Sequence, residues 1–264
     1  MMELENLTVG YRSGRHERIL MEHLNLRLAQ GCVTALLGGN GRGKSTLLRT
    51  IAGLQAPLDG KVTVDGMDIS TCQPSQLARL LAIVTGQSVG AGSFTVEELV
   101  RLGRQPYTGF FGRLSSHDRM IVDEAMDMVG VRQLAARHVA TLSDGERQRV
   151  MIAKAISQQT PVIILDEPTA FLDVANRLEL LSLMRDVSHN QDKAVLMSIH
   201  DVSSVLPIAD ELWLVVPDGN GDGVEAKVLT GTPSEMIASG GMQRLFPDRD
   251  IRFDADRGDF IAGS

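Results

Sequence analysis

The stretch that decides the fold is Val33–Ser45, which reads VTALLGGNGRGKS. Its first five residues form an apolar run, which is typical of a strand that is covered on both faces. The run leads into glycines with the spacing G-x-x-x-x-G-K-S, and a helix is expected at 44–52, closed by Gly53. A strand, a glycine-rich turn and a helix in this order predict a loop that binds phosphate at the helix N-terminus.

The residue types in this loop suit the phosphates of a nucleotide. Glycines permit the backbone angles that a tight loop needs, and backbone amides from Gly41 to Lys44 would surround phosphate oxygens. Lys44 would reach the β- and γ-phosphates, and the Ser45 hydroxyl would bind Mg²⁺. The predicted nucleotide-binding residues of this loop are Gly38, Gly39, Asn40, Gly41, Arg42, Gly43, Lys44, Ser45 and Thr46.

A second apolar run, VIIL at 162–165, ends in the acids Asp166 and Glu167. Ligands of open α/β sheets bind at the carboxyl ends of the strands, so both acids should face the same ligand as the glycine loop. Asp166 is predicted to hold Mg²⁺ through water. Glu167 is predicted to be the general base that orients the attacking water. Taken alone, two acids at a strand end could also be solvated carboxylates.

The rest of the chain alternates between strand and helix patterns, which predicts an α/β protein with a largely parallel sheet. Further strands are expected around Leu24–Leu28 and at 61–64, 80–85, 194–199, 212–216 and 226–229. Further helices are expected from a Thr95 cap, from a Ser116 cap to Gly130, at 143–157 and at 176–188. The helical middle would be a subdomain inserted in the core, and Thr232-Pro233 would begin a short helical appendage.

Between the glycine loop and the acidic strand lies Leu142–Gln148, LSDGERQ. A serine and a glycine just before a helix offer a hydroxyl and amides to an anion, although Ser-Asp-Gly is also a common turn. With the loop and the acids in this order, the chain resembles the nucleotide-binding subunit of an ABC (ATP-binding cassette) transporter. The family's LSGGQ stretch stands here as LSDGE, with Asp144 and Glu146 as departures.

The resemblance covers about residues 4–231 and implies a P-loop NTPase of the ABC type. It implies a parallel core sheet, an antiparallel β subdomain and a helical subdomain at about 90–158. We therefore expect a nucleotide-binding domain at 1–231 and an appendage at 232–264. ATP and Mg²⁺ are the implied ligands.

The resemblance also implies roles for residues outside the loop. Tyr11 would stack on adenine, Gln87 would touch Mg²⁺ and couple to a membrane subunit, and His200 would contact the γ-phosphate. Ser143, Gly145, Glu146 and Asp173 would act on the nucleotide of a second copy. Ala170 stands where the family usually has serine, and Gly39 where it often has proline.

Within the family, the chain most resembles the importers of ferric siderophores, haem and vitamin B12, because of Leu102–Leu114, LGRQPYTGFFGRL. The implied partners are a second copy in a head-to-tail ATP sandwich, a transmembrane permease and an extracytoplasmic binding protein. The alternatives are an ABC ATPase of another transport system or a permease-independent soluble ABC ATPase. A ribosome-remodelling factor would normally carry two cassettes, and a chromosome ATPase would need long heptad arms.

Composition agrees with a globular protein that has no membrane segment of its own. The 264 residues are 43% hydrophobic and 22% charged, and no apolar run is long enough to span a bilayer. The first ten residues lack the features of a signal peptide, and the two cysteines, Cys32 and Cys72, are expected to be reduced. Together with the resemblance to a transporter subunit, this implies a peripheral protein on the cytoplasmic face of the inner membrane. A net charge of −7 argues against nucleic acid as a partner.

Aromatic residues are scarce, at 4%, and four of them fall shortly after Gln87: Phe94, Tyr107, Phe110 and Phe111. They stand among glycines and a proline, which suit a surface loop. The segment 94–111 is therefore predicted to line a docking pocket for a cytoplasmic helix of the permease. The alternative is that these rings pack the helical subdomain onto the core. The remaining histidines show no metal-ligand spacing.

Overall fold

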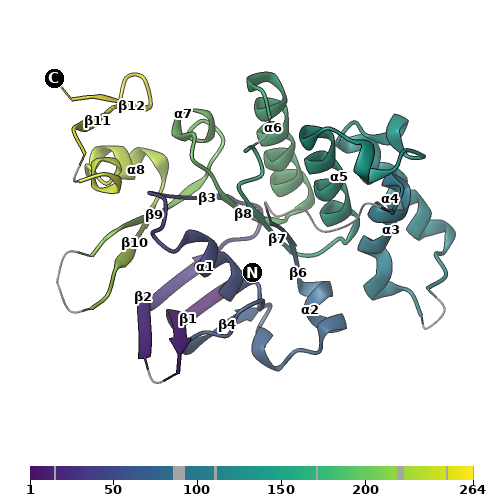
Figure 1. Ribbon diagram of the computed structural model, residues 1–264, viewed down its shortest axis with the longest axis horizontal. Helices are drawn as coiled ribbons and strands as arrows, with labels where there is room; N and C mark the ends of the chain where they lie inside the picture. Colours follow the sequence, from purple (N-terminus) through teal and green to yellow (C-terminus); the bar gives the residue numbers. More distant parts are fainter. Residues whose placement is uncertain are drawn as a thin grey trace.

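A six-stranded sheet forms the centre of the molecule, in the order β10-β9-β3-β8-β7-β6 (Figure 1). The computed structural model describes residues 1–14, 16–85, 93–109, 112–170, 172–218, 223–247 and 249–263. The strands of this sheet are β3 (Val33–Gly38), β6 (Leu81–Val84), β7 (Val162–Asp166), β8 (Ala194–Ser198), β9 (Glu211–Pro217) and β10 (Ala226–Gly231). All neighbours from β9 to β6 are parallel, and β10 is antiparallel to β9.

Both faces of this sheet are buried, as the apolar runs predict. Along β3, Val33, Ala35 and Leu37 belong to one hydrophobic core, and Leu36 belongs to the other. The side chains of β7 alternate between the two cores in the same way. The parallel strands therefore all end at one edge, where β3 meets the glycine loop and β7 meets the two acids.

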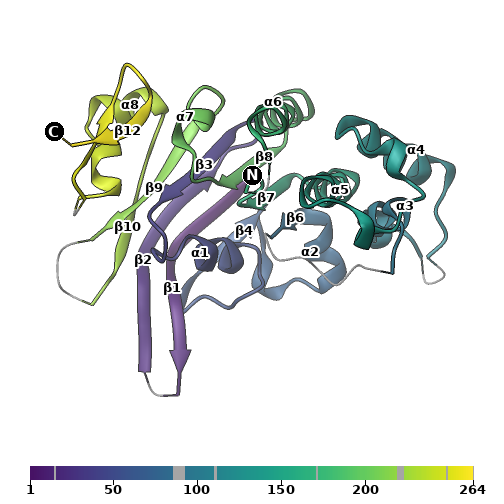
Figure 2. The same cartoon turned by 45° about the horizontal axis from the view of Figure 1, so that its top comes forward.

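One face of the central sheet is covered by α1 and by an antiparallel sheet in the order β2-β1-β4-β5. The elements on this side are β1 (Met2–Ser13), β2 (His16–Leu28), α1 (Lys44–Ile51), β4 (Asp59–Val64), β5 (Met67–Asp68), η1 (Ile69–Thr71) and α2 (Pro74–Leu80). In Figure 2, β1 and β2 run side by side as a long pair beside α1. This sheet is the antiparallel part that the family resemblance implies.

The other face is covered by helices, of which α3 to α5 form a group at one end of the molecule (Figure 1). Their bounds are α3 (Val96–Arg101), η2 (Leu102–Tyr107), α4 (Ser116–Met128), η3 (Arg132–Leu134), η4 (Val139–Thr141), α5 (Asp144–Ser157), α6 (Val174–Gln191) and α7 (Val202–Val205). Thr95 and Glu98 form the expected capping box. Within the described ranges, no helix combines the length and the apolar character that crossing a bilayer requires.

Several of the predicted boundaries are wrong by one or more residues. The cap of α4 is Ser115 rather than Ser116, because only Ser115 stands three residues before Asp118, whose carboxylate completes the capping box. Leu80 closes α2 instead of opening β6. The helix expected at 176–188 begins at Val174, directly after its cap Asp173.

The C-terminal appendage is not only helical as predicted. It contains α8 (Pro233–Ala238), η5 (Met242–Leu245) and the two-stranded pair β11 (Ile251–Asp254) and β12 (Asp259–Ala262). Phe260 meets Phe246 and Phe253 edge to face, with ring centroids 5.0 and 5.3 Å apart. A Cβ placed on Gly39 would lie 3.7 Å from the ring of Phe246, so the appendage reaches the glycine loop.

We predict that Phe260→Ala lowers the free energy of unfolding by about 2 kcal/mol, since it removes a half-buried ring and two edge-to-face contacts. Chemical denaturation of the full chain measures this loss. Phe94→Ala, which truncates a ring of the helical subdomain that is 38% exposed, is the control and should cost less. Equal stabilities of Phe260→Ala and the unmodified chain would contradict the packing role.

Candidate functional site: two half-sites of a nucleotide-binding cassette

The glycine loop joins β3 to α1 in a conformation that only glycine adopts easily. Gly41 and Gly43 have φ values of 76° and 87°, and Gly43 caps α1. The buried Lys44 turns back over the loop, and its Nζ donates to the carbonyl oxygens of Gly38 at 2.7 Å and Gly39 at 3.1 Å. Burial lowers the pKa of the Lys44 ammonium, although the carboxylates of Glu167 and Asp166 oppose this effect. The lysine is therefore held as a fixed donor at the loop.

Asp166 ends β7 as a buried carboxylate whose position is set by two hydroxyls. Ser198, at the end of β8, donates to Asp166 Oδ1 at 2.6 Å. The hydroxyl of Ser45, in the first turn of α1, lies 3.5 Å from the same oxygen. Carboxylate and hydroxyl oxygens are the ligands that Mg²⁺ prefers. This pair of oxygen donors fits the magnesium-binding role predicted for Ser45 and Asp166.

Glu167 follows Asp166 in a left-handed backbone conformation, with φ of 52°. Such a conformation is costly for a residue other than glycine and is common at functional sites. Its amide donates to the Ser198 hydroxyl at 2.9 Å. Its Oε1 lies 2.8 Å from His200 Nε2, and because a carboxylate only accepts, the histidine nitrogen is the donor. The second carboxylate oxygen of Glu167 is therefore available to another donor.

Tyr11 lies beside the start of α1, where its hydroxyl is 2.5 Å from the Thr46 hydroxyl. The ring is 45% exposed, which leaves a face for a planar ligand. Arg18 stands opposite Tyr11 in the β1–β2 register and forms a bidentate ion pair with Glu225. Sequence reasoning missed Arg18, because its place opposite Tyr11 is set by the pairing register of β1 and β2.

These side chains surround a first cavity of about 620 Å³. Its lining residues are Tyr11, Arg18, Leu20, Asn40, Gly41, Gly43, Lys44, Ser45, Thr46, Glu167 and His200. The structure thus brings most of the predicted loop residues together with Glu167, the predicted general base, and His200, the predicted γ-phosphate contact. Among the residues that sequence reasoning missed is Ser198, which holds both acids from the neighbouring strand.

The four residues predicted to act on the nucleotide of a second copy line a second cavity of about 640 Å³, which shares no lining residue with the first. Ser143, Gly145 and Glu146 reach it from the start of α5, and Asp173 reaches it as the cap of α6. Asp173 Oδ1 accepts from the amide of Asn176 at 2.8 Å. Within one chain, the two sets of predicted site residues are therefore separate.

Glu146 places a carboxylate beside Ser143 at the start of α5. Its Oε2 accepts from the Ser143 amide at 2.8 Å, and the Ser143 hydroxyl lies 3.1 Å from the same oxygen. The Ser143 amide, with a smaller contribution from the hydroxyl, lowers the pKa of Glu146, so the carboxylate is ionised at neutral pH. Each acid here has a nearby arginine: Arg147 lies 2.8 Å from Asp144, and Arg137 lies 3.6 Å from Glu146.

Some of the predicted residues are not placed in either cavity. Gln87, Phe110 and Phe111 lie outside the described residues. Among the remaining histidines, His23 lies 2.7 Å from Asn6, and His189 lies 2.9 Å from Asp210. Across the described ranges, no group of three or more His, Cys, Asp and Glu side chains could hold a metal ion.

The sheet order, the glycine loop at the end of β3 and the acids at the end of β7 define a P-loop NTPase. The ABC transporter family model matches residues 21–170. An uncharacterised ABC transporter ATP-binding protein of Methanocaldococcus jannaschii is 40% identical over 215 residues, 81% of this chain and 73% of that protein. The chain belongs to the ABC transporter family, and it is an ATP-binding cassette of the ATPase type.

Two further relatives and two solved structures are also similar to this chain. The iron(3+)-hydroxamate import ATP-binding protein of Bacillus subtilis is 38% identical, covering 76% of this chain and 74% of that protein. The ferric enterobactin transport ATP-binding protein of Escherichia coli is 34% identical, covering 92% and 85%. A structure described as an inward-facing metal-chelate type ABC transporter has a TM-score of 0.76, 28% identity and coverage of 99% and 95%. A dimeric bacterial ABC transporter cassette has a TM-score of 0.71, 25% identity and coverage of 81% and 93%.

We predict that Ser198→Ala lowers the turnover of ATP by about 10–100-fold, because the hydroxyl orients both Asp166 and the Glu167 amide. ATP affinity should change little, since Lys44 and the loop are untouched. Steady-state hydrolysis and titration with a fluorescent ATP analogue measure the two effects. Ser188→Ala is the matched control: this serine is equally buried, and its hydroxyl donates only to the Lys193 carbonyl at 2.8 Å. Equal turnover in the two variants would contradict the role of Ser198.

Proposed function

We propose that this chain is the ATPase subunit of a membrane importer and that it works as a head-to-tail dimer. The observation that carries the proposal is the division of the site residues between two cavities of one chain. The first cavity has residues of the loop, Lys44 and Glu167 but no group from α5. The second has the Ser143 hydroxyl and the positive end of α5 but no lysine. Two copies arranged head to tail would complete both sites.

In each completed site, the loop would bind the phosphates of ATP and Tyr11 would stack on the base. Ser45 and Asp166 would hold Mg²⁺, which supplies charge neutralisation on the β- and γ-phosphates when bound. His200 occupies Oε1 of Glu167, so Oε2 would accept the proton of the water that attacks the γ-phosphorus. Ser143 and Gly145 of the second copy would contact the γ-phosphate from the other side.

The substrate class is proposed from the relatives together with the sequence of the segment Leu102–Leu114. Two relatives are named for ferric hydroxamate and ferric enterobactin, which are iron chelates. We infer that this chain powers the import of a ferric siderophore, haem or cobalamin. Its remaining partners would be a permease and an extracytoplasmic binding protein, and its place would be the cytoplasmic face of the inner membrane.

The permease would dock on the helical subdomain, at a third cavity of about 510 Å³. This cavity is lined by Arg101, Leu102, Gln105, Thr108, Gly112, Leu114 and Arg119. Four of these residues fall within the segment 94–111, for which the sequence predicts a docking pocket. Phe94 is exposed and available to a partner, but Tyr107 is engaged within the chain, in agreement with the packing alternative for that ring.

Removal of the general base tests the chemistry. Glu167→Gln should keep ATP binding and lose turnover by about 10²–10⁴-fold, because an amide does not take a proton from water. The variant should accumulate as an ATP-bound closed dimer, which size-exclusion chromatography with ATP detects. Near-normal hydrolysis by this variant in the presence of the permease would refute the assignment.

The composite site is tested by Ser143→Arg, which should abolish hydrolysis and leave ATP binding to the dilute monomer unchanged. The reason is that Ser143 acts on the nucleotide of the other copy. In a mixed dimer with Lys44→Ala subunits, one site carries both lesions and the other carries neither, so part of the activity should return. A tenfold loss of ATP affinity in the monomer would show that Ser143 acts within its own chain.

A further inference from the structure

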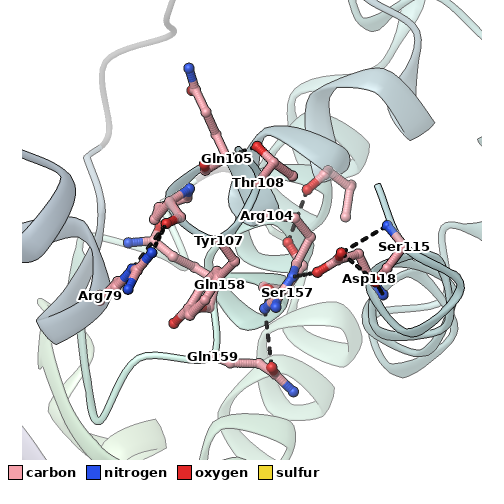
Figure 3. Close-up of polar contacts among 12 residues, drawn as sticks. Arg79, Arg104, Gln105, Tyr107, Thr108, Ser115, Asp118, Ser157, Gln158 and Gln159 are labelled. Carbon is pink, nitrogen blue, oxygen red and sulfur yellow. Dashed lines mark hydrogen bonds and ion pairs between the residues drawn. The ribbon is translucent and has the colours of Figure 1, made fainter. Parts of the chain in front are cut away.

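The segment Leu102–Tyr107, LGRQPY, joins α3 to the rest of the helical subdomain, and the proposed chemistry uses none of its residues. It contacts α2, α3 and α5, and part of it lines the third cavity. Figure 3 shows its side chains in contact with residues from α2, α4 and the end of α5.

Arg104 is the centre of this network and is 3% exposed. Its Nε donates to Asp118 Oδ1, in the first turn of α4, at 3.0 Å. Its Nη1 donates to the Ser157 carbonyl at the end of α5, at 2.9 Å, and to Gln159 Oε1 at 3.0 Å. One buried guanidinium therefore fixes the start of α4 and the end of α5 relative to each other (Figure 3).

Asp118 divides its two oxygens between two elements. Oδ1 faces Arg104, and Oδ2 accepts from the amide of Ser115 at 2.9 Å and from its hydroxyl at 2.6 Å. Chiefly the Ser115 hydroxyl, and to a smaller extent Arg104, hold the pKa of Asp118 below its usual range. The ion pair is therefore charged at neutral pH, and losing one partner would leave the other buried without a counter-charge.

Tyr107 extends the network to the core. Its ring lies between two guanidinium groups, with the Arg104 carbon 4.1 Å and the Arg79 carbon 5.2 Å from the centroid. Its hydroxyl donates to the Gln158 carbonyl at 2.9 Å. Arg79 belongs to α2 and also donates from Nε to the Pro106 carbonyl at 2.9 Å (Figure 3).

Gln158 closes the network at the edge of the core sheet. Its Nε2 donates to the carbonyls of Ala78 at 2.7 Å and Leu81 at 2.9 Å, where α2 passes into β6. The end of α5 is therefore bonded on one side to the core and on the other to Arg104 and Tyr107. The opposite end of α5 carries Ser143 as its cap.

We propose that Arg104 and Tyr107 are positioning residues, which set the orientation of α5 on the core sheet and thereby the placement of Ser143 in the nucleotide site of the second copy. Their neighbours Gln105 and Thr108 line the third cavity, so a permease segment bound there would act on the same network. The proposal rests on the proposed function for its consequence in catalysis. The orientation of α5 itself is measurable without hydrolysis.

The experiment combines a distance measurement with kinetics on the full chain. Spin labels are attached at Leu54→Cys, after α1 on the core domain, and at Asp144→Cys, at the start of α5, after Cys32→Ser and Cys72→Ser. Leu54 is 60% exposed and the Asp144 side chain is 64% exposed, and kcat is measured on the chains without labels. The variants are Arg104→Gln, Tyr107→Leu and Tyr107→Phe. The last keeps the ring between the guanidinium groups and loses only the bond to Gln158. The double variant Arg104→Gln, Asp118→Asn removes both buried charges together and guards against misfolding of the single variant.

The matched control is Arg132→Gln. Arg132 forms an ion pair with Asp123 of α4 at 3.0 Å, but the pair is exposed and lies outside the network. The Arg132→Gln variant therefore removes an arginine–aspartate pair of α4, the helix that also carries Asp118, and leaves the contacts of α5 with the network unchanged.

We expect Arg104→Gln, the double variant and Tyr107→Leu to broaden the distance distribution and to lower kcat by about tenfold or more, as small misplacements do. The affinity of the monomer for ATP should stay within about twofold, because the first cavity is remote from the network. Tyr107→Phe should show a smaller effect on both measurements, and Arg132→Gln should show none.

Narrow distributions and unchanged kcat in the Arg104 and Tyr107 variants would overturn the proposal. A lower melting temperature with an unchanged distance distribution would overturn it as well, because it would show a purely structural role. If the unmodified chain failed to hydrolyse ATP, the proposed function would fail, and the distance distributions would still decide whether this network orients α5.

Discussion

The hydrogen bond from the Ser198 hydroxyl to the Asp166 carboxylate, 2.6 Å long, fixes the position of a predicted magnesium ligand. It links the order of the strands to the chemistry of the site. It exists because β8 lies between β3 and β7, so that the ends of all three strands meet at one edge. The same hydroxyl accepts from the Glu167 amide and stabilises a backbone turn that few residues adopt. The positions of the two acids therefore depend on a strand that carries neither of them.

A second constraint is the balance of charge at the start of α5. Two acids at this helix end would weaken its attraction for an anion, although each also suits the helix dipole. Arg147 beside Asp144 and Arg137 beside Glu146 offset those charges. The departures from the LSGGQ pattern thus change which groups surround Ser143, while the hydroxyl and the helix end remain in one cavity.

The sequence predicts those parts of the fold and site that local chemistry determines. The glycine loop, its helix and the acidic strand were predictable because each is specified by neighbouring residues. Ser198 was not, because its contact with Asp166 spans 32 positions and depends on the order of the strands. The choice between Ser115 and Ser116 depended on which serine could reach Asp118.

The interpretation of Tyr107 shows the limit of composition as a guide. A rare ring among glycines suggests a docking surface, but two arginines from different elements, Arg79 and Arg104, engage its faces. Such a pairing cannot be inferred from residues 102–107 alone, since Arg79 belongs to α2. The extra strands of the appendage were missed for a related reason: they are short, and their rings pack against a distant core.

The helix α5 has 14 residues, and at 1.5 Å per residue it is a rod about 21 Å long. A tilt of about one degree at its bonded end moves its free end by about 0.4 Å, so a few degrees separate a hydrogen bond from no bond at Ser143. In mechanical terms, α5 is a lever with its fulcrum at Ser157–Gln159. The stiffness of the contacts at that fulcrum determines how much of a small displacement in one subunit reaches the nucleotide bound by the other.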